Sequence, residues 1–563
     1  MRAGVRRALG IILALVLQSV GPAAAVTSDR TPCTGAVASA APAATAAGIE
    51  ILRACGNAAD AAVAVALALA VVHPMAGNLG GGGFAVARFG GELAALDFRE
   101  TAPAAASAGM YLDADGNPVA ERSQVGPLAA GVPGSPAGLR ELQRRYGRLP
   151  WHVVVAPAVR LAAGGFTVTA RLHDEVSRAQ KFLSRFPETA AVWLPGGAAP
   201  ATGARMRLPR LAAALRTYAA RGPEGLTSGR AAAAIVAAST RYGGILTTAD
   251  LVAYRPVWRA PLRARSYGWE VGTMPLPSSG GIILAQTVAV LEHLHWESLP
   301  RLGVERIHLL AEAWRRAYAD RYLLGDPSTS LAGPAQLLDP AWIARQAGTI
   351  DRGRATPSQG VQRWPGQAER RETTHLSVVD GNGNAVSLTT TLNGSFGCGL
   401  LVPELGILLN NEMDDFAAAP GRPNLYGLVQ GEANAIAPGK RMLSSMAPTI
   451  AWRGADTIVL GSPGGSHIPT AVTQVFLNVA VDGDDLQTAV TRARVHHQWL
   501  PDELAAEAGA LAPEVQQALI ERGHTVHSPV RLGEVHAVFR HADGRCEAAA
   551  DARGPGAGAV LGP

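Results

Sequence analysis

The sequence is short of lysine, cysteine and nucleotide-binding signatures, and each shortage excludes a class of function. Lys181 and Lys440 are the only lysines among 50 basic residues, and the arginines form no single basic stripe, so no nucleic-acid partner is expected. The four cysteines show neither CxxC nor zinc spacing, and His496 and His497 are adjacent rather than i, i+4. The glycine-rich stretches lack the GK[ST] of a phosphate-binding loop. The sequence therefore predicts no metal and no cofactor.

The first 25 residues have the features of a secretory signal peptide. Three arginines precede an apolar stretch over residues 8–20, and small residues follow at 23–25. The stretch is shorter than the roughly 20 residues that cross a bilayer, so no stable membrane span is expected after cleavage. An uncleaved signal that anchors the chain is the alternative. Removing residues 1–25 lowers the formal charge from +5 to about +2. We expect an exported protein, periplasmic or secreted. In either compartment Cys33 and Cys55 could form a disulfide or remain free thiols, and the sequence leaves both alternatives open.

The remaining chain is globular and large enough for an extensive core. The full 563-residue sequence contains 48% apolar and 17% charged residues. The run "NAADAAVAVALALAVVHP" predicts a buried helix capped by Asn57 and ended at His73-Pro74, and "GFAVARFGGELAALDFRE" predicts two strands around Gly90-Gly91. The run "RIHLLAEAWRRAYADRYLLGDP" predicts an amphipathic helix against a sheet. Helical and strand-like runs occur in blocks, which favours α+β sheets packed face to face with helices outside.

A polar segment rich in proline and glycine precedes a hairpin with many hydroxyl groups. Residues 351–372 have almost no apolar periodicity and are the best linker candidate in the chain. In "TTHLSVVDGNGNAVSLTTTLN", a two-residue turn at Asn382-Gly383 would place Thr373 opposite Leu392. Thr391 would then point to the other face, unless a one-residue bulge shifts the register.

The position of Thr373 directly after this linker suggests a catalytic role. A threonine hydroxyl is a weak nucleophile without a base. If the bond between Glu372 and Thr373 were cut, the freed α-amine, with a pKa near 7.7–8.0, could act as that base. Thr391 is then the candidate second hydroxyl that orients the first.

The chain resembles the γ-glutamyltransferases (γ-glutamyltranspeptidases), which are N-terminal nucleophile hydrolases that cleave themselves before a threonine. The resemblance covers nearly the whole chain after residue 25 and is carried by "GNAADAAVAVALAL", "HPMAGNLGGGGF", "LDFRETAP", "GVPGSPAGL", "MPLPSSGG", "TTHLSVVDGNGNAVSLTTTLN", "NNEMDDF", "PNLYGLVQG", "KRMLSSMAPTI", "GSPGGS" and "HHQWLPDEL". It implies a four-layer αββα sandwich built from a large subunit, residues 26–372, and an associated small subunit, residues 373–563.

The resemblance also assigns roles in binding a γ-glutamyl donor, whose α-carboxylate and α-ammonium form a zwitterion. Arginine in "LDFRE" and the serine pair in "LSSMAPT" would hold the carboxylate, and the acidic "NNEMDDF" with a nearby asparagine would hold the ammonium. The Gly-Gly pair would form the oxyanion hole, and a tyrosine would lie on a lid over the pocket. The residues are Arg99, Ser444 and Ser445; Asn393, Glu412 and Asp415; Gly464 and Gly465; and Tyr426.

The resemblance implies that Thr373 cleaves γ-glutamyl amides such as glutathione and passes the γ-glutamyl group to water, an amino acid or a peptide. Two alternatives stay open. A glutaryl or cephalosporin acylase of the same fold would not need the ammonium partners Asn393, Glu412 and Asp415, whose presence speaks against it. A non-catalytic exported binding protein would not need Thr373, and it too is disfavoured.

Overall fold

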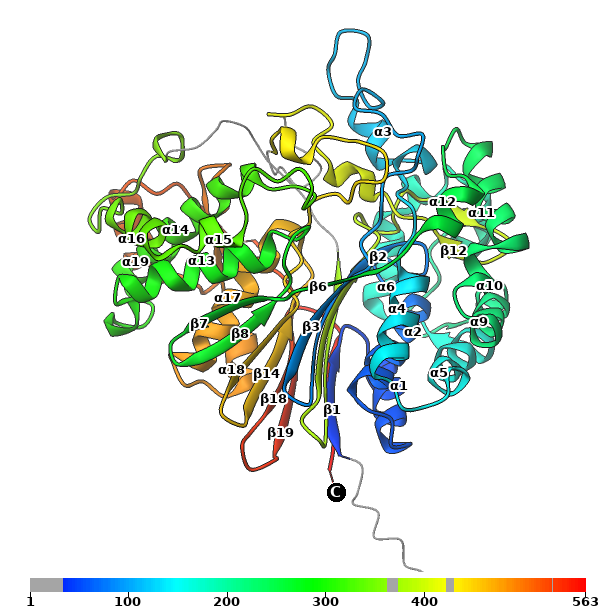
Figure 1. The fold of residues 1–563 in the computed structure, drawn as a ribbon, viewed down its shortest axis with the longest axis horizontal. Helices are drawn as coiled ribbons and strands as arrows, with labels where there is room; N and C mark the ends of the chain where they lie inside the picture. The colour runs from blue at the N-terminus through cyan, green and yellow to red at the C-terminus, as the bar shows by residue number, and fades with distance from the viewer. Residues whose placement is uncertain (1–33, 362–372, 422–429, 529, 563) are drawn as a thin grey trace, which may run out of the picture.

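The computed structural model describes residues 34–361, 373–421, 430–528 and 530–562. Two antiparallel sheets are packed face to face between two layers of helices (Figure 1). The first sheet has the order β20 (Ala557–Leu561), β1 (Gly35–Ser39), β9 (Thr374–Asp380), β10 (Ala385–Thr391), β2 (Gly82–Phe89), β3 (Glu92–Asp97) and β6 (Val257–Arg259). The second has the order β19 (Cys546–Ala550), β18 (His536–Arg540), β14 (Asp456–Gly461), β13 (Thr449–Arg453), β8 (Trp269–Thr273) and β7 (Leu262–Ser266).

One helical layer covers the outer face of the first sheet, on the right in Figure 1. Leu376, Val378, Val386 and Leu388 of the sheet pack into the same apolar core as these helices. The layer comprises α1 (Pro42–Arg53), α2 (Ala58–Val72), α4 (Ser135–Tyr146), α5 (Trp151–Gly164), α6 (Ala170–Arg178), α8 (Pro187–Trp193), α9 (Pro209–Arg221), α11 (Gly229–Arg241) and α12 (Thr248–Ala253).

The other layer covers the second sheet, on the left in Figure 1, and shares a second core with it. It comprises α13 (Gly280–His293), α14 (Val304–Asp320), α16 (Pro340–Gly348), α17 (Ile468–Ala480), α18 (Leu486–Thr491) and α19 (Pro513–Glu521). Small sheets are formed by β4 (Phe166–Thr167) with β5 (Arg205–Met206), β11 (Leu401–Val402) with β12 (Ile407–Leu408), and β15 (Val495–His496) with β16 (Leu504–Ala506) and β17 (Val526–His527).

Several elements agree with the patterns in the sequence, and one is more buried than its pattern suggests. Helix α2 begins with the predicted Asn57 cap, whose side chain accepts from the backbone of Ala59 and Asp60, and it ends before His73. Strands β2 and β3 flank the predicted Gly90-Gly91 turn. Helix α14 packs its predicted apolar face into the core of the second sheet, and its polar residues are buried as well, from residue 306 to residue 320. No helix in the described ranges is long and apolar enough to cross a membrane.

The register of the β9–β10 hairpin differs by one residue from the predicted one. Thr374 pairs with Thr390 and His375 with Thr389, so a three-residue loop, residues 381–383, joins the strands. The Asp380 carboxylate accepts the backbone N–H groups of Asn382 and Asn384, and Gly383 has a φ of 78°. A three-residue loop that ends in a left-handed glycine is a favoured hairpin connection. The expected pairing of Thr373 with Leu392 is therefore wrong.

The hydroxyl groups of this hairpin form a polar layer between the two sheets. Ser377 Oγ donates to the His536 carbonyl over 2.9 Å, and Ser387 Oγ donates to the Leu460 carbonyl over 3.0 Å. His375 Nδ1 lies 2.9 Å from Thr389 Oγ1. Because both faces of the hairpin are buried, these side chains must satisfy one another and the facing sheet.

Candidate active site

The corrected register brings Thr391 opposite Thr373 at the end of the hairpin. The pairing between Thr374 and Thr390, continued by one residue, aligns the two threonines across neighbouring strands. Both side chains are buried and line one cavity. Thr391 Oγ1 accepts the N–H of Asn393 over 2.8 Å, which fixes its position. The sequence identified this pair of hydroxyls but left the register open: a two-residue turn would have placed them on opposite faces, and the structure has the register shifted by one residue.

The cavity collects the predicted residues from five separate parts of the chain. The predicted residues that line it are Arg99, Thr373, Thr391, Asn393, Glu412, Asp415, Ser444, Ser445 and Gly465. Met446 and Ile468 complete the lining and were not predicted, because single apolar residues carry no sequence signal of their own. Tyr426 and Glu372 lie outside the described residues.

Arg99 is fully buried between the two acidic residues assigned to the substrate ammonium. It follows strand β3, and Arg441 Nη1 and Tyr254 Oη both donate to its carbonyl oxygen, at 2.9 and 2.8 Å. Its guanidinium forms ion pairs with Glu412 and Asp415 at the two ends of a short 3₁₀ turn. The cation that faces the acidic cluster in this structure is therefore Arg99.

The neighbouring Glu100 adds a third carboxylate that the sequence reasoning missed. Its carboxylate is fully buried, lies 3.9 Å from Arg99 and has no hydrogen-bond partner among the described residues. Burial raises the pKa of Glu100 to about 7, although Arg99 opposes this shift. Burial also raises the pKa of Glu412, which has Glu100 and Asp415 close by. Three carboxylates thus surround the Arg99 guanidinium, and a second buried arginine, Arg321, lies close enough to Asp415 to interact with its charge.

Three polar atoms of predicted site residues have no protein hydrogen-bond partner among the described residues, although they are buried. They are Asn393 Oδ1, Glu412 Oε2 and Ser445 Oγ. Buried polar atoms are normally paired, so these atoms are available to a polar ligand. Asn393 Nδ2 donates to the Asn411 carbonyl, so the amide oxygen is left free to accept.

The backbone N–H of Ser444 is already engaged with protein. Its N–H donates to the Pro277 carbonyl over 2.8 Å, and its hydroxyl oxygen accepts the N–H of Met446 over 3.1 Å. Ser444 can therefore offer a ligand its hydroxyl proton but not its backbone N–H.

Gly464 and Gly465 lie where strand β14 is connected to helix α17. Their φ angles are 130° and 53°, values that favour glycine. Gly465 lines the cavity, whereas Gly464 lies next to it in the chain. A glycine turn before a helix places backbone N–H groups and the positive end of the helix dipole at one point, where they can stabilise an anion.

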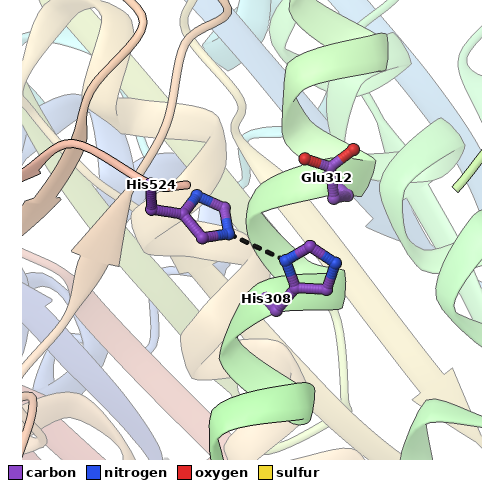
Figure 2. A group of neighbouring side chains, drawn as sticks. All are labelled: His308, Glu312 and His524. Carbon is purple, nitrogen blue, oxygen red and sulfur yellow. Dashed lines mark hydrogen bonds between the residues drawn. The ribbon is translucent and has the colours of Figure 1, made fainter. Parts of the chain in front are cut away.

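Two other side-chain groups contain residue types that can act as a nucleophile or as metal ligands. Cys398 is fully buried, and burial raises the pKa of its thiol to about 12, so it is not a ready nucleophile. Cys55 is disulfide-bonded, whereas Cys33 lies outside the described residues. The group His308, Glu312 and His524 has its ligand atoms within 4.8 Å of one another (Figure 2).

The donor atoms of that histidine–glutamate group are already engaged with protein. His308 Nδ1 lies 2.8 Å from His524 Nε2, and His308 Nε2 lies 2.7 Å from the Asp351 carbonyl oxygen. The Glu312 carboxylate accepts from Arg316 over 2.6 Å and from the N–H of Thr356 over 3.0 Å. Two arginines beside the carboxylate oppose a cation, so the group is a hydrogen-bond network.

Comparisons with known proteins show which family the chain resembles over most of its length. Residues 44–561 match the family described as Gamma-glutamyltranspeptidase. The chain is 42% identical over 526 residues to a glutathione hydrolase proenzyme of Escherichia coli, covering 92% of this chain and 90% of the relative. It is 36% identical over 546 residues to an acylase ACY 1 proenzyme of a Pseudomonas species, covering 94% of both. The crystal structure of cephalosporin acylase from Bacillus halodurans superposes with a TM-score of 0.82 at 26% identity, covering 96% of this chain and 99% of that one.

Proposed function

This chain belongs to the gamma-glutamyltranspeptidase family and is a glutathione hydrolase and γ-glutamyltransferase, and from that premise we propose that Thr373 becomes its nucleophile by self-cleavage. The observation that carries the proposal is the single cavity in which Thr373 and Thr391 lie with Arg99, Glu412 and Asp415. The word "proenzyme" in the name of the Escherichia coli relative supports processing.

In the proposed cleavage, Thr373 Oγ attacks the carbonyl carbon of Glu372. The C–N bond breaks, the nitrogen takes up a proton, and an ester between Glu372 and the Thr373 side chain results. Water hydrolyses this ester and leaves a carboxylate on Glu372 and a free amine and hydroxyl on Thr373. That amine is the base that takes the hydroxyl proton during turnover, and Thr391 holds the hydroxyl in place.

In turnover, Thr373 Oγ attacks the γ-carbonyl carbon of the donor. The oxyanion lies against the N–H groups of Gly464 and Gly465, and the leaving amine departs with the proton held by the Thr373 amine. The γ-glutamyl ester that remains reacts with water to give glutamate, or with the amine of an amino acid or peptide to give a new γ-glutamyl amide.

Donor recognition is proposed as an exchange of ion-pair partners. Without substrate, Arg99 forms ion pairs with Glu412 and Asp415. A bound zwitterion offers its carboxylate to Arg99 and the Ser445 hydroxyl, and its ammonium to Glu412, Asp415 and Asn393 Oδ1. Because the substrate adds one charge of each sign, no net charge is buried, and the desolvation cost of a lone ion is avoided.

The remaining features of the precursor are part of the same proposal. Residues 26–372 and 373–563 would form the two subunits, held together because β9 and β10 lie between β1 and β2 of the same sheet. Residues 1–25 would direct export to the periplasm or beyond. Tyr426 would cover the pocket as a lid, a role that concerns a segment outside the described residues.

A comparison of two chromogenic donors tests the proposed donor recognition. We expect the processed protein to release the chromophore from a γ-glutamyl amide, to do so poorly from the matching glutaryl amide, and to lose the activity in Thr373→Ala. A preference for the glutaryl amide would favour an acylase, although the acylase relative is less similar than the glutathione hydrolase, at 36% against 42% identity. No release from either amide by intact, folded protein would favour a binding protein.

A further inference from the structure

The chain upstream of the proposed cleavage site is docked against the C-terminal part of the molecule. We call residues 349–361 the docked segment. Ser358 is fully buried, and each of its polar groups is bound. Its N–H donates to Asp502 Oδ2 over 2.7 Å, its carbonyl accepts the Trp499 Nε1–H over 2.8 Å, and its hydroxyl accepts from Arg315 Nη1 over 2.8 Å.

A second set of contacts holds the docked segment at its upstream end. The Ala355 N–H donates to the Arg522 carbonyl over 2.7 Å, and Arg522 Nη1 donates to the Arg352 carbonyl over 3.1 Å. His308 Nε2 lies 2.7 Å from the Asp351 carbonyl oxygen, which can only accept, so this nitrogen carries the proton. His308 Nδ1 then accepts from His524 Nε2, the contact drawn in Figure 2. Burial lowers the pKa of both rings, to about 3 for His524, so both are neutral.

The charges under the docked segment balance one another. Arg315 and Arg316 on helix α14 face Glu312 of the same helix, and Arg315 also forms an ion pair with Asp502. Despite burial, the two arginines hold the pKa of Glu312 below its usual range. His497 Nε2 lies 3.4 Å from Asp502, and its Nδ1 accepts the Trp499 N–H. These contacts fix the loop that carries two of the three Ser358 partners, Trp499 and Asp502. The network therefore depends on residues from both proposed subunits.

Holding the subunits together does not require these contacts. Strands β9 and β10 of the small subunit are paired along their length with β1 and β2 of the large subunit. A continuous sheet with two buried faces binds far more strongly than a few side-chain contacts. The docked segment is therefore not needed to hold the subunits together. Its position in the chain, just before the proposed cleavage site, indicates a different role.

We propose that the docked segment positions the linker for self-cleavage, with Ser358, Trp499 and Asp502 as positioning residues. The inference rests on the proposed cleavage before Thr373. With the segment docked, residues 362–372 are the only ones between its last residue and Thr373. If it were released, the free chain would begin after helix α16, which ends at Gly348, and would comprise residues 349–372. Docking therefore fixes the chain 11 residues before the proposed cleavage site instead of 24, which limits the number of backbone conformations that compete with the one in which the Glu372 carbonyl faces Thr373 Oγ.

The double variant Ser358→Ala/Trp499→Phe removes two contacts and leaves the Asp502 ion pair in place. Asp502→Asn weakens the third contact and removes the charge that pairs with Arg315. The matched control is Asp351→Asn, which lies in the same segment but whose carboxylate accepts only the Gly353 N–H among the described residues. Each full-length chain is made by cell-free synthesis with a radioactive pulse, and conversion to two bands is followed on denaturing gels. The kcat of each fully processed protein on a chromogenic γ-glutamyl amide is measured separately.

We expect the double variant and Asp502→Asn to process at least threefold more slowly than wild type, with kcat within about 1.5-fold of wild type and Asp351→Asn unchanged in both. Processing within 1.5-fold of wild type in both test variants would overturn the inference. So would an equal loss of kcat and processing rate, because that result indicates general damage to the fold. If the wild type itself yields no fragment that begins at Thr373, the proposed cleavage fails, and this outcome is distinct from either of the others.

Discussion

Glu412→Gln separates donor recognition from folding. The substitution keeps the size of the side chain but removes one of three carboxylates around Arg99. Because Asp415 still pairs with Arg99 in this variant, the fold loses little, and the thermal unfolding midpoint should stay near that of wild type. The substrate ammonium, in contrast, loses a charged partner. A hydrogen bond to a charged group contributes about 1.5–3 kcal/mol, which corresponds to about a 10- to 100-fold increase in KM for the donor.

The assay is steady-state release from a chromogenic γ-glutamyl amide, with kcat and KM determined separately. The ammonium contact is the same in the ground state and the transition state, so KM should rise while kcat stays near wild type. Asp414→Asn is the matched control, because the Asp414 carboxylate accepts from Ser123 and does not line the cavity. A KM within twofold of wild type for Glu412→Gln, or an equal rise for Asp414→Asn, would refute the assignment of Glu412 to the ammonium.

The other predictions concern Arg99, the pH dependence of binding, and acid stability. Arg99→Lys cannot bridge two carboxylates as a guanidinium does, so donor KM should rise at least tenfold while the processed fraction on a gel stays unchanged. Glu100 is protonated below its raised pKa of about 7 and the cluster then loses negative charge, so donor KM should rise as pH falls from 8 to 6; a flat profile would contradict this. Burial lowers the pKa of His497 to about 4 and that of His73 and His524 to about 3. Between these values and the ordinary histidine pKa of about 6.5, the unfolded chain binds protons that the folded chain does not bind. The unfolding temperature of the uncleaved Thr373→Ala chain should therefore fall steeply between pH 6.5 and 4, and an unchanged temperature would be the contrary result.

Local patterns in the sequence were sufficient to predict several helices and strands. The Asn57 cap and the uninterrupted apolar run define helix α2, and alternation around Gly90-Gly91 defines strands β2 and β3. These features depend on neighbours in the chain, so the sequence carries them directly. The site residues were identified through motifs, and nine of them line one cavity.

Features that depend on distant parts of the chain could not be read from the sequence. A Gly-Asn-rich turn is compatible with two loop lengths, and the hairpin register depends on which of them forms. In the structure the Asp380 carboxylate accepts the N–H groups of Asn382 and Asn384 and so stabilises the three-residue loop. The pairing of Arg99 with Glu412 joins residues 313 positions apart. Docking of Ser358 depends on Trp499 and Asp502, more than 140 positions downstream, although the polar segment itself looks like an ordinary linker.

The most direct test of the account is amino-terminal sequencing of the smaller fragment of the purified protein, run beside the Thr373→Ala variant on a denaturing gel. The account predicts a fragment that begins Thr-Thr-His-Leu-Ser, from Thr373, in the wild type, and a single uncleaved, inactive chain in the variant. A wild-type protein that stays whole while it turns over γ-glutamyl amides, or a fragment that begins at another residue, would contradict it.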